Sequence, residues 1–438
     1  MAENGPLKVA LLGAGVVGSQ VARVLLAEGD TLESRVGRRL ELVGIGVRRE
    51  GIERAGIDSS LFTTDSMGLV TRGDIDVVIE VIGGIEPARS LVLAAMRSGA
   101  SVITANKALL AQDMAKLSAT ANDNEVDLYY EAAVAGAIPI IRPLRESLVG
   151  DEIRAVMGIV NGTTNYILDK MTTASLSFEE ALQQAQDLGF AEADPTADVE
   201  GHDAAAKAAI LAGLAFHTDV RQSDVFCEGI TSVTADDIAA ADAMGCVVKL
   251  LAITKLTNDD EPRVIVKVHP TMVPKTHPLA SVSGAFNAIF VDSRDAGQLM
   301  FLGAGAGGAP TASAVMGDVV TAARNRLRGS AAHVQTGYMK REVAPIGDAT
   351  ARYYISFDVE DRPGVLAACA TVFARHNVSL QTVQQSYLEG LERRDGFAAR
   401  LGVMTHEASE TDLAGVLAEL AEASFVGTGV NYMRVEGS

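Results

Sequence analysis

The stretch LKVALLGAGVVG, residues 7–18, decides the fold of the first part of this chain. An apolar run that is typical of a buried strand leads directly into the pattern G-x-G-x-x-G, and a helix-like segment follows. The first glycines permit a tight turn and close approach to a pyrophosphate, and the helix N-terminus adds its dipole and free N–H groups. We therefore predict a dinucleotide site formed by Gly13, Ala14, Gly15, Val16, Val17 and Gly18. The alternative is a glycine-rich turn that binds no ligand.

Further apolar runs follow this turn, and helix-like segments lie between them. The runs are Leu40–Val47, Asp76–Gly84, Ser101–Lys107 and Val126–Val134. Short strands that alternate with helices predict βαβ units and a parallel sheet. We expect an α/β, Rossmann-type nucleotide-binding domain over residues 1–145.

The pattern changes after about residue 146, where helix-like and strand-like segments no longer alternate. Alanine-rich helices are predicted near Phe178–Leu188 and Ala204–Phe216, and strands at residues 263–273 and 286–293. We expect an α+β catalytic and oligomerisation domain over 146–305, and a glycine-rich loop and helix over 306–340 that return to the first domain. Residues 350–438 have segments in the order strand, helix, strand, strand, helix, strand, which predicts a ferredoxin-like βαββαβ domain.

Composition restricts the partners and the compartment. The 438 residues carry a formal net charge of −19, which argues against nucleic acid as a partner. Neither a secretory signal nor an apolar run of about 18 or more residues is present, so we expect no membrane association. The three cysteines, Cys227, Cys246 and Cys369, are scattered, which favours a reducing cytoplasm.

The end of the second strand indicates which dinucleotide is bound. Arg48 and Arg49 come directly after this strand, at the place that meets the adenosine ribose. Because arginine suits a 2′-phosphate, we predict a preference for NADP. Glu50 follows, and a carboxylate suits the 2′-hydroxyl of NAD, so use of NAD stays open.

Two lysines are candidates for the proton transfer that must accompany hydride transfer. Lys107 ends the run Ser101–Lys107, on the edge of a parallel sheet where ligands bind. Lys207 lies within an otherwise apolar helix, four residues after Asp203 and on the same face. The alternatives are a lysine that reaches solvent and an ordinary surface ion pair.

The stretch GFAEADPTADVEGHDAAAK, residues 189–207, is rich in carboxylates. A divalent metal site is disfavoured, because Pro195 and Gly201 interrupt the geometry and no second set of ligands completes it. A pocket for a cationic substrate remains, and we expect Asp194 and Glu200 to be structural or solvated.

Several motifs together resemble the homoserine dehydrogenase family over nearly the whole chain. They are VIGGIEPAR, TANKALL, EAAVAGAIPI, GIVNGTTNYIL, GFAEADPTADVEGHDAAAK and GAGAGGAPTASAVMGDV. The resemblance implies reversible NAD(P)-dependent oxidation of L-homoserine to L-aspartate 4-semialdehyde, in threonine and methionine synthesis. It implies that Lys207 is the proton donor and that Lys107 lies near the nicotinamide.

The same resemblance implies roles for further residues. Glu192 and Asp203 would hold the substrate ammonium group, Asp198 would support the site, and Gly162 and Thr163 would line it. Gly189 and Gly307 would lie near the cofactor. A monovalent cation, Na⁺ or K⁺, would be held largely by the carbonyls of Glu131, Val134, Gly136 and Ile138. Phe190 stands where many family members have tyrosine, which puts one substrate contact in doubt.

The last part of the chain resembles an ACT domain, because DRPGVL follows its first strand. This resemblance implies that an amino acid binds at an interface between two copies. We therefore expect feedback by threonine through Asp361, Gly364 and Asn377, in a homo-oligomer that is a dimer or a tetramer. The alternative is a tail that only oligomerises, with Asp361 capping a helix.

Two other functions fit parts of the sequence. A related semialdehyde dehydrogenase would need a thiolate, and neither Cys227 nor Cys246 has a setting that suits a nucleophile. A non-catalytic amino-acid sensor would use the nucleotide fold as a switch and would tolerate the loss of Lys207.

Overall fold

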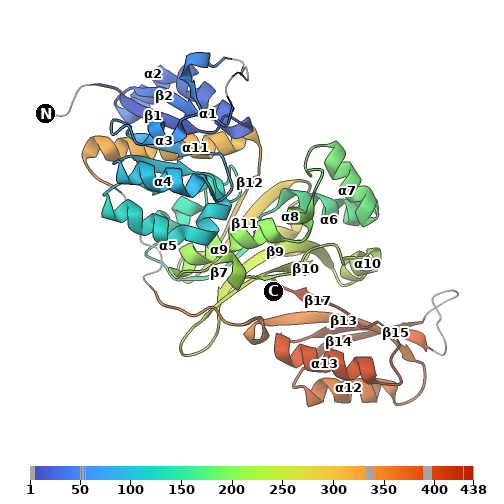
Figure 1. Cartoon of the computed structure of the whole chain (residues 1–438). Coiled ribbons are helices and arrows are strands. Elements are labelled where there is room, and N and C mark those ends of the chain that lie inside the picture. Colours follow the sequence, from blue (N-terminus) through green and yellow to red (C-terminus); the bar gives the residue numbers. More distant parts are fainter. Residues whose placement is uncertain are drawn as a thin grey trace.

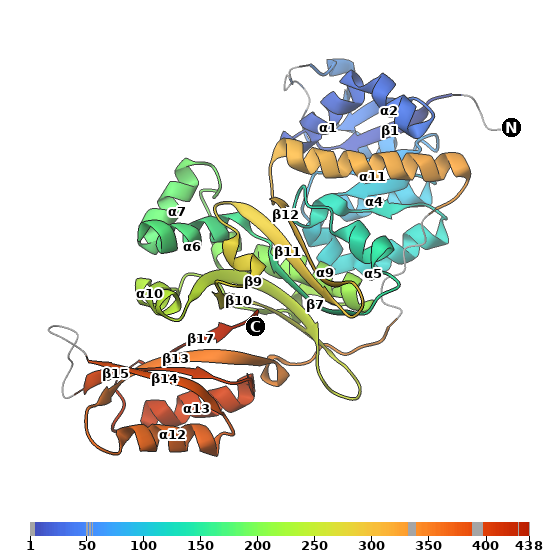
Figure 2. The same cartoon turned by 180° about the vertical axis from the view of Figure 1, so that it is seen from behind.

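The structure is a computed structural model that describes residues 5–49, 51, 54, 56–331, 339–387, 397–427 and 429–437. Within these residues it contains two sheets, and Figures 1 and 2 show them one above the other, with the C-terminal segment at the lower end. No helix in the described ranges is long and apolar enough to cross a membrane.

The first sheet is parallel throughout and has the order β3-β2-β1-β4-β5-β6. This is the doubly wound order of a Rossmann-type fold, as predicted. Its strands are β1 (Leu7–Leu12), β2 (Leu40–Gly46), β3 (Phe62–Thr63), β4 (Val77–Glu80), β5 (Ser101–Thr104) and β6 (Leu128–Tyr129).

Helices cover both faces of this sheet, which explains why its central strands are apolar on both sides. The helices are α1 (Val16–Ala27), α2 (Gly29–Val36), α3 (Ser66–Val70), α4 (Ala88–Arg97), α5 (Lys107–Asp123) and α11 (Gly308–Arg328). The last of these comes from far along the chain and packs beside α1, as Figure 2 shows. Helix α11 thus packs on the first sheet although it follows the second sheet along the chain.

Three predicted strands are shorter than expected, and polar side chains end two of them. The carboxylate of Glu80 accepts the backbone N–H groups of Ile82 and Gly83 and closes β4 into a turn. The run Ser101–Lys107 ends as a strand at Thr104, and Lys107 is instead the first residue of α5, after the N-cap Asn106. Only two residues of Val126–Val134 pair as a strand, in β6.

The second sheet is mixed and begins with the order β12-β11-β7-β9-β10, with β8 beside β10. Its strands are β7 (Ile153–Ile159), β8 (Phe226–Cys227), β9 (Cys246–Leu256), β10 (Val264–Pro274), β11 (Phe286–Ser293) and β12 (Gly297–Ala304). The sequence analysis did not identify β9 or β12. Helices of this part are α6 (Gly162–Ala174), α7 (Phe178–Asp187), α8 (Thr196–Val199), α9 (His202–Phe216) and α10 (Ala235–Ala243).

Helix α9 lies between the two sheets and is buried on nearly all sides. It packs against β9 and β10 on one side and against α5 on the other. This position explains its composition, HDAAAKAAILAGLAF, because small residues let neighbouring elements approach closely. Asp203 and Lys207 are therefore carried on a helix that is enclosed by packing.

The C-terminal segment forms the predicted βαββαβ unit, with the ferredoxin-like sheet order β17-β13-β15-β14. Its elements are β13 (Thr350–Glu360), α12 (Val365–Arg375), β14 (Leu380–Tyr387), β15 (Phe397–Thr405), β16 (Ala408–Ser409), α13 (Glu410–Glu422) and β17 (Asn431–Val435). Its sheet is not separate, because β17 also pairs with β10.

Candidate active site

The glycine-rich turn has the shape that a dinucleotide needs. Gly13 has φ +102°, and a Cβ atom on Gly18 would lie 2.1 Å from the carbonyl oxygen of Gly13. Gly15 is different, because a Cβ atom there would meet nothing within 4 Å. Gly15 is also the N-cap of α1 and provides no side-chain cap, which leaves helix N–H groups free for an anion. The turn therefore fits a pyrophosphate.

Three arginines lie around this turn or at the adjacent strand end. Arg48 and Arg49 are exposed just after β2, and Glu50 lies outside the described residues. Arg54 was missed by the sequence analysis. Its Nε donates to the carbonyl oxygen of Ala14 at 2.8 Å, and its guanidinium lies 4.9 Å from the ring centre of Phe62. No sequence pattern indicates this, because Arg54 follows the strand at a distance and reaches back to the turn.

A cleft of about 310 Å³ lies where the two sheets meet. Residues from the glycine turn, the end of β4, the start of α5 and the segment before α11 line it, and so do both candidate lysines. The lining residues include Val17, Gly83, Lys107, Ala133, Gly136, Lys207, Gly305 and Thr311.

Asp203 lies between the two lysines. Its Oδ2 accepts from Lys207 Nζ at 2.7 Å, and its Oδ1 forms an ion pair with Lys107 Nζ. Lys207 Nζ also donates to the carbonyl oxygen of Val160 at 2.6 Å. Burial acts to raise the pKa of Asp203, but the charges of Lys207 and Lys107 outweigh burial and hold that pKa well below its usual range.

This geometry excludes the surface interpretation of Lys207. The side chains of Lys207 and Asp203 are only 10% and 7% exposed, whereas that of Lys107 is 44% exposed. The pair is therefore buried, and Lys107 offers its ammonium group at the mouth of the cleft.

Asn161 connects two of the predicted carboxylates. Its Nδ2 lies 2.7 Å from Asp198 Oδ1 and 2.9 Å from Asp203 Oδ2. Its Oδ1 caps α6 by accepting the N–H of Thr164. The sequence analysis placed Gly162 and Thr163 beside the substrate, but it did not name Asn161. The N-cap signal was visible, but the link to Asp198 and Asp203 depends on the tertiary fold.

Three other predicted substrate residues lie in two separate segments of the chain, at the start of α6 and after α7. Gly162 and Thr163 open α6 directly after Asn161, and Thr163 Oγ1 donates to the carbonyl oxygen of Phe190. The ring of Phe190 lies tilted against that of Tyr166, with the ring centres 5.1 Å apart. Glu192 is exposed, and its backbone carbonyl accepts from Gln186. The structure thus brings Asp198 and Asp203 together through Asn161, and it leaves the Glu192 side chain exposed.

Two glycines, Gly307 and Gly189, remain among the residues that were predicted to lie near the cofactor. Gly307 is the N-cap of α11 with φ +123°, next to the cleft residues. Gly189 follows α7 with φ +75° and is exposed. Asp194 accepts from Thr196, and Glu200 accepts from Thr231, in line with structural roles.

The predicted cation segment, residues 131–138, has no acidic side chain free for a metal. Both carboxylate oxygens of Glu131 accept backbone N–H groups, from Ile141 at 2.7 Å and from Arg142 at 3.0 Å. In the described part of the chain no group of three or more His, Cys, Asp or Glu residues could hold a metal ion. A cation in this segment would therefore depend on carbonyl oxygens, which suits a monovalent ion.

The three predicted regulatory residues lie around α12. Asp361 accepts from Gln385 of β14, Gly364 is the N-cap of α12 with φ +91°, and Asn377 follows the helix with φ +58°. Asp361 is therefore not the helix cap that the alternative interpretation required.

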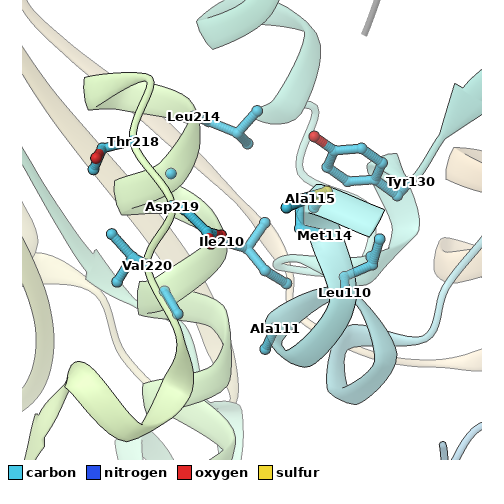
Figure 3. A pocket seen from close by; sticks show the side chains of 12 residues that line it. Leu110, Ala111, Met114, Ala115, Tyr130, Ile210, Leu214, Thr218, Asp219 and Val220 are labelled. Atoms are coloured by element: carbon cyan, nitrogen blue, oxygen red, sulfur yellow. The ribbon is translucent and has the colours of Figure 1, made fainter. Parts of the chain in front are cut away.

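A second cavity, of about 270 Å³, lies between α5 and α9. Figure 3 shows that its walls are mostly aliphatic and that the Tyr130 hydroxyl points toward α9. This hydroxyl has no hydrogen-bond partner. The cavity lacks the paired charges of the cleft, so we assign the chemistry to the cleft.

Lys249 is another residue that the sequence analysis missed. It lies on β9, buried, and donates to Asn165 Oδ1 at 3.1 Å and to the carbonyl oxygen of Val282 at 2.6 Å. Asn165 in turn donates to the carbonyls of Gly284 and Phe286. Lys249 thus supports the helix that begins with the substrate-side loop. Burial lowers the pKa of Lys249 to about 8.

These features are those of a dinucleotide-dependent oxidoreductase. Comparisons with known proteins agree. Residues 13–131 match the model of the homoserine dehydrogenase NAD binding domain, residues 139–320 the homoserine dehydrogenase model, and residues 353–425 the ACT domain model. Homoserine dehydrogenase of Corynebacterium glutamicum is 52% identical over 97% of this chain and 94% of its own. The chain belongs to the homoserine dehydrogenase family.

Solved structures support the same assignment. The crystal structure of a homoserine dehydrogenase from Thiobacillus denitrificans matches with a TM-score of 0.89 at 34% identity, and covers 99% of both chains. A hyperthermophilic archaeal homoserine dehydrogenase in complex with NADPH matches with a TM-score of 0.61 at 26% identity, over 72% of this chain and 97% of the other.

We predict that Lys249 makes the stability of the protein depend on pH. Between pH 8 and about pH 10 the unfolded chain keeps a proton on this lysine that the folded chain has released, so stability rises with pH by up to about 3 kcal/mol. Urea unfolding of wild type and Lys249→Met at pH 7.5 to 10 measures this. Lys116→Met, at an exposed lysine of α5, is the control. Equal pH slopes in wild type and Lys249→Met would contradict the prediction.

Proposed function

We propose that the protein is a homoserine dehydrogenase that interconverts L-homoserine and L-aspartate 4-semialdehyde with a nicotinamide cofactor, in threonine and methionine synthesis. One observation carries the proposal: a buried carboxylate, Asp203, holds a lysine on each oxygen at the cleft beside the glycine turn. Family membership supports the choice of substrate.

In this proposal Lys207 is the proton donor. When bound, the nicotinamide supplies the hydride that reduces the aldehyde carbon. Lys207 Nζ gives the aldehyde oxygen its proton, and in the reverse direction takes the proton from the alcohol. Asp203 and the Val160 carbonyl orient this ammonium group, so that one N–H direction remains for the substrate. Lys107, the first residue of α5, lies near the reacting oxygen in this proposal.

The acidic residues have different roles in this proposal. Asp203 and Glu192 attract the substrate ammonium group, and Asp198 acts through Asn161, which fixes both aspartates. Gly162 and Thr163 bring backbone close to the substrate. The thiol alternative gains no support, because burial raises the pKa of Cys227 to about 11 and also raises that of Cys246.

The cofactor in this proposal is NADP in preference to NAD. The phosphates lie on the turn Gly13–Gly18, Gly189 and Gly307 contact the cofactor, and Arg48, Arg49 and Arg54 meet the 2′-phosphate. The archaeal relative in complex with NADPH supports this choice. A monovalent cation, held by the carbonyls of Glu131, Val134, Gly136 and Ile138, braces the segment between the sheets.

The C-terminal domain binds threonine as a feedback inhibitor in this proposal, at Asp361, Gly364 and Asn377, within a homo-oligomer. The match to the ACT domain supports amino-acid binding. The exposed outer strand β14, with Tyr387 71% exposed, and the outer strand β12, with Leu302 59% exposed, support association of chains.

The first prediction concerns the reaction. NADPH absorbance is followed with L-aspartate 4-semialdehyde, and Lys207→Ala is expected to lower kcat/KM by about 10²- to 10⁴-fold, because the proton donor is lost. Lys116→Ala, an exposed lysine of α5, is the control and retains the wild-type rate. A wild type without turnover would favour the non-catalytic sensor, and an active Lys207→Ala variant would refute the mechanism.

The second prediction concerns the cofactor. The variant Arg48→Ala/Arg49→Ala is expected to raise KM for NADPH about tenfold or more, while KM for NADH changes little, because only NADPH carries the 2′-phosphate. Arg54→Ala is expected to act in the same direction. Arg97→Ala, an exposed arginine at the end of α4, is the control. Equal effects on both cofactors would show that these arginines do not select NADP.

The third prediction concerns regulation. Removal of all residues after 345 would strip β17 from β10, so a point substitution is the cleaner test. Asp361→Ala is expected to raise the threonine concentration for half-inhibition about tenfold, with kcat unchanged. Glu407→Ala, at an exposed position of the same domain, is expected to behave as wild type. Unchanged inhibition in Asp361→Ala would reject this site.

A further inference from the structure

The second sheet runs without interruption from the active-site domain into the C-terminal domain. Strand β17 pairs with β10 through Thr271–Arg434 and Met272–Val435, and on its other side with five residues of β13. Figures 1 and 2 both show β17 between β10 and β13. A shift of the C-terminal domain therefore acts directly on the sheet below α9.

Arg434 joins the two domains through its side chain. Its Nε and Nη2 donate to the two carboxylate oxygens of Glu410, at the start of α13. Its Nη1 donates to Glu228 Oε2 at 2.8 Å, on the active-site domain. The guanidinium also lies over the rings of Phe226, at 5.1 Å, and Tyr432, at 5.6 Å.

In this arrangement the loss of either carboxylate would leave the buried charge of Arg434 incompletely paired. Its side chain is only 4% exposed, so its charge has little solvent to replace a lost carboxylate. A planar guanidinium can satisfy two carboxylates on different edges, which a lysine cannot do in the same geometry. The distance between Glu410 and Glu228 is thus set by one rigid group.

Glu228 belongs to a short segment, residues 226–230, that contacts the residues just before α9. Residues Phe226 and Cys227 form β8 beside β10, and the N–H of Ile230 donates to the carbonyl oxygen of Val199 at 2.8 Å. A Cβ atom on Gly229 would lie 2.3 Å from that same carbonyl oxygen. Segment 226–230 and residues 199–201 are therefore in backbone contact, and neither can move alone.

Residues 199–201 lead directly into the catalytic helix. Gly201 is the N-cap of α9, and a Cβ atom there would lie 3.0 Å from Cys227 Sγ. Asp203 follows two residues later and Lys207 one turn after that. Asp198, on the other side of Gly201, bonds to Asn161. The position of segment 226–230 therefore influences both aspartates of the site.

We infer that Arg434 and Glu228 are positioning residues, through which the C-terminal domain holds the start of α9 and with it Asp198, Asp203 and Lys207. The inference rests on the proposed function for its kinetic test. It also names a physical route by which an event in the C-terminal domain reaches the lysines, since Glu410 belongs to that domain.

The test compares Glu228→Gln, Arg434→Met and the double variant with a matched control. Each is expected to raise KM for L-aspartate 4-semialdehyde about tenfold, the effect of one lost charge-assisted hydrogen bond, while KM for NADPH changes less than about twofold. The double variant is expected to be no worse than the single variants, because both remove the same contact. The control is Arg375→Met, which removes an exposed ion pair between α12 and α13 of the C-terminal domain. It keeps the wild-type KM.

Hydrogen–deuterium exchange gives a readout that does not need turnover. Amides of residues 199–205 are expected to exchange faster in Glu228→Gln than in wild type or in the control. If wild type has no activity, the proposed function fails while this readout still decides the inference. If Arg434→Met does not fold, Glu228→Gln, at a side chain 38% exposed, suffices. Unchanged exchange and unchanged KM in Glu228→Gln would overturn the inference.

Discussion

The rest of the structure depends on one buried carboxylate, Asp203, and on the two ammonium groups that flank it. A charge in this position is costly unless opposite charges and hydrogen bonds surround it. Lys207 comes from the same helix, but Lys107 comes from the start of α5, a helix that covers the first sheet, and Asn161 from the N-cap of α6. The site therefore exists only when the two sheets meet at one particular separation. The cleft at this meeting point is lined by both lysines and by the glycine-rich turn.

Close backbone contacts hold the two sheets at that separation. The segment 131–138 passes so near residues 304–305 that a Cβ atom on Gly136 would lie 2.5 Å from the Gly305 carbonyl oxygen. The buried Asp318 of α11 bonds to the backbone of Glu131 and to Arg142, so the returning helix anchors this segment as well. The return of α11 to the first sheet thus has a function in the site, because it ties the end of the second sheet to the nucleotide-binding part.

The C-terminal domain is joined to the second sheet. It completes the second sheet through β17, and three basic residues near this seam, Lys255, Lys267 and Arg434, are matched by Glu436, Glu410 and Glu228. Unpaired, these charges would destabilise the seam. A domain that is joined in this way can transmit a change in its own sheet to the strands beneath α9, which a domain on a flexible linker cannot do.

Many of the local elements could be predicted from the sequence alone. Apolar runs, glycine turns and caps predicted the Rossmann-type order, the nucleotide turn at Gly13–Gly18 and the βαββαβ order of the last part, because each depends on neighbours along the chain. Lys207 was also recognisable as unusual, because it is a lysine within the apolar helix α9. Only the tertiary structure decided which side chains meet: Lys107 with Asp203, Asn161 with both aspartates, Arg54 with the glycine turn, and Arg434 with Glu228. These partners lie far apart in sequence, and periodicity records which face of an element is buried but not what that face contacts.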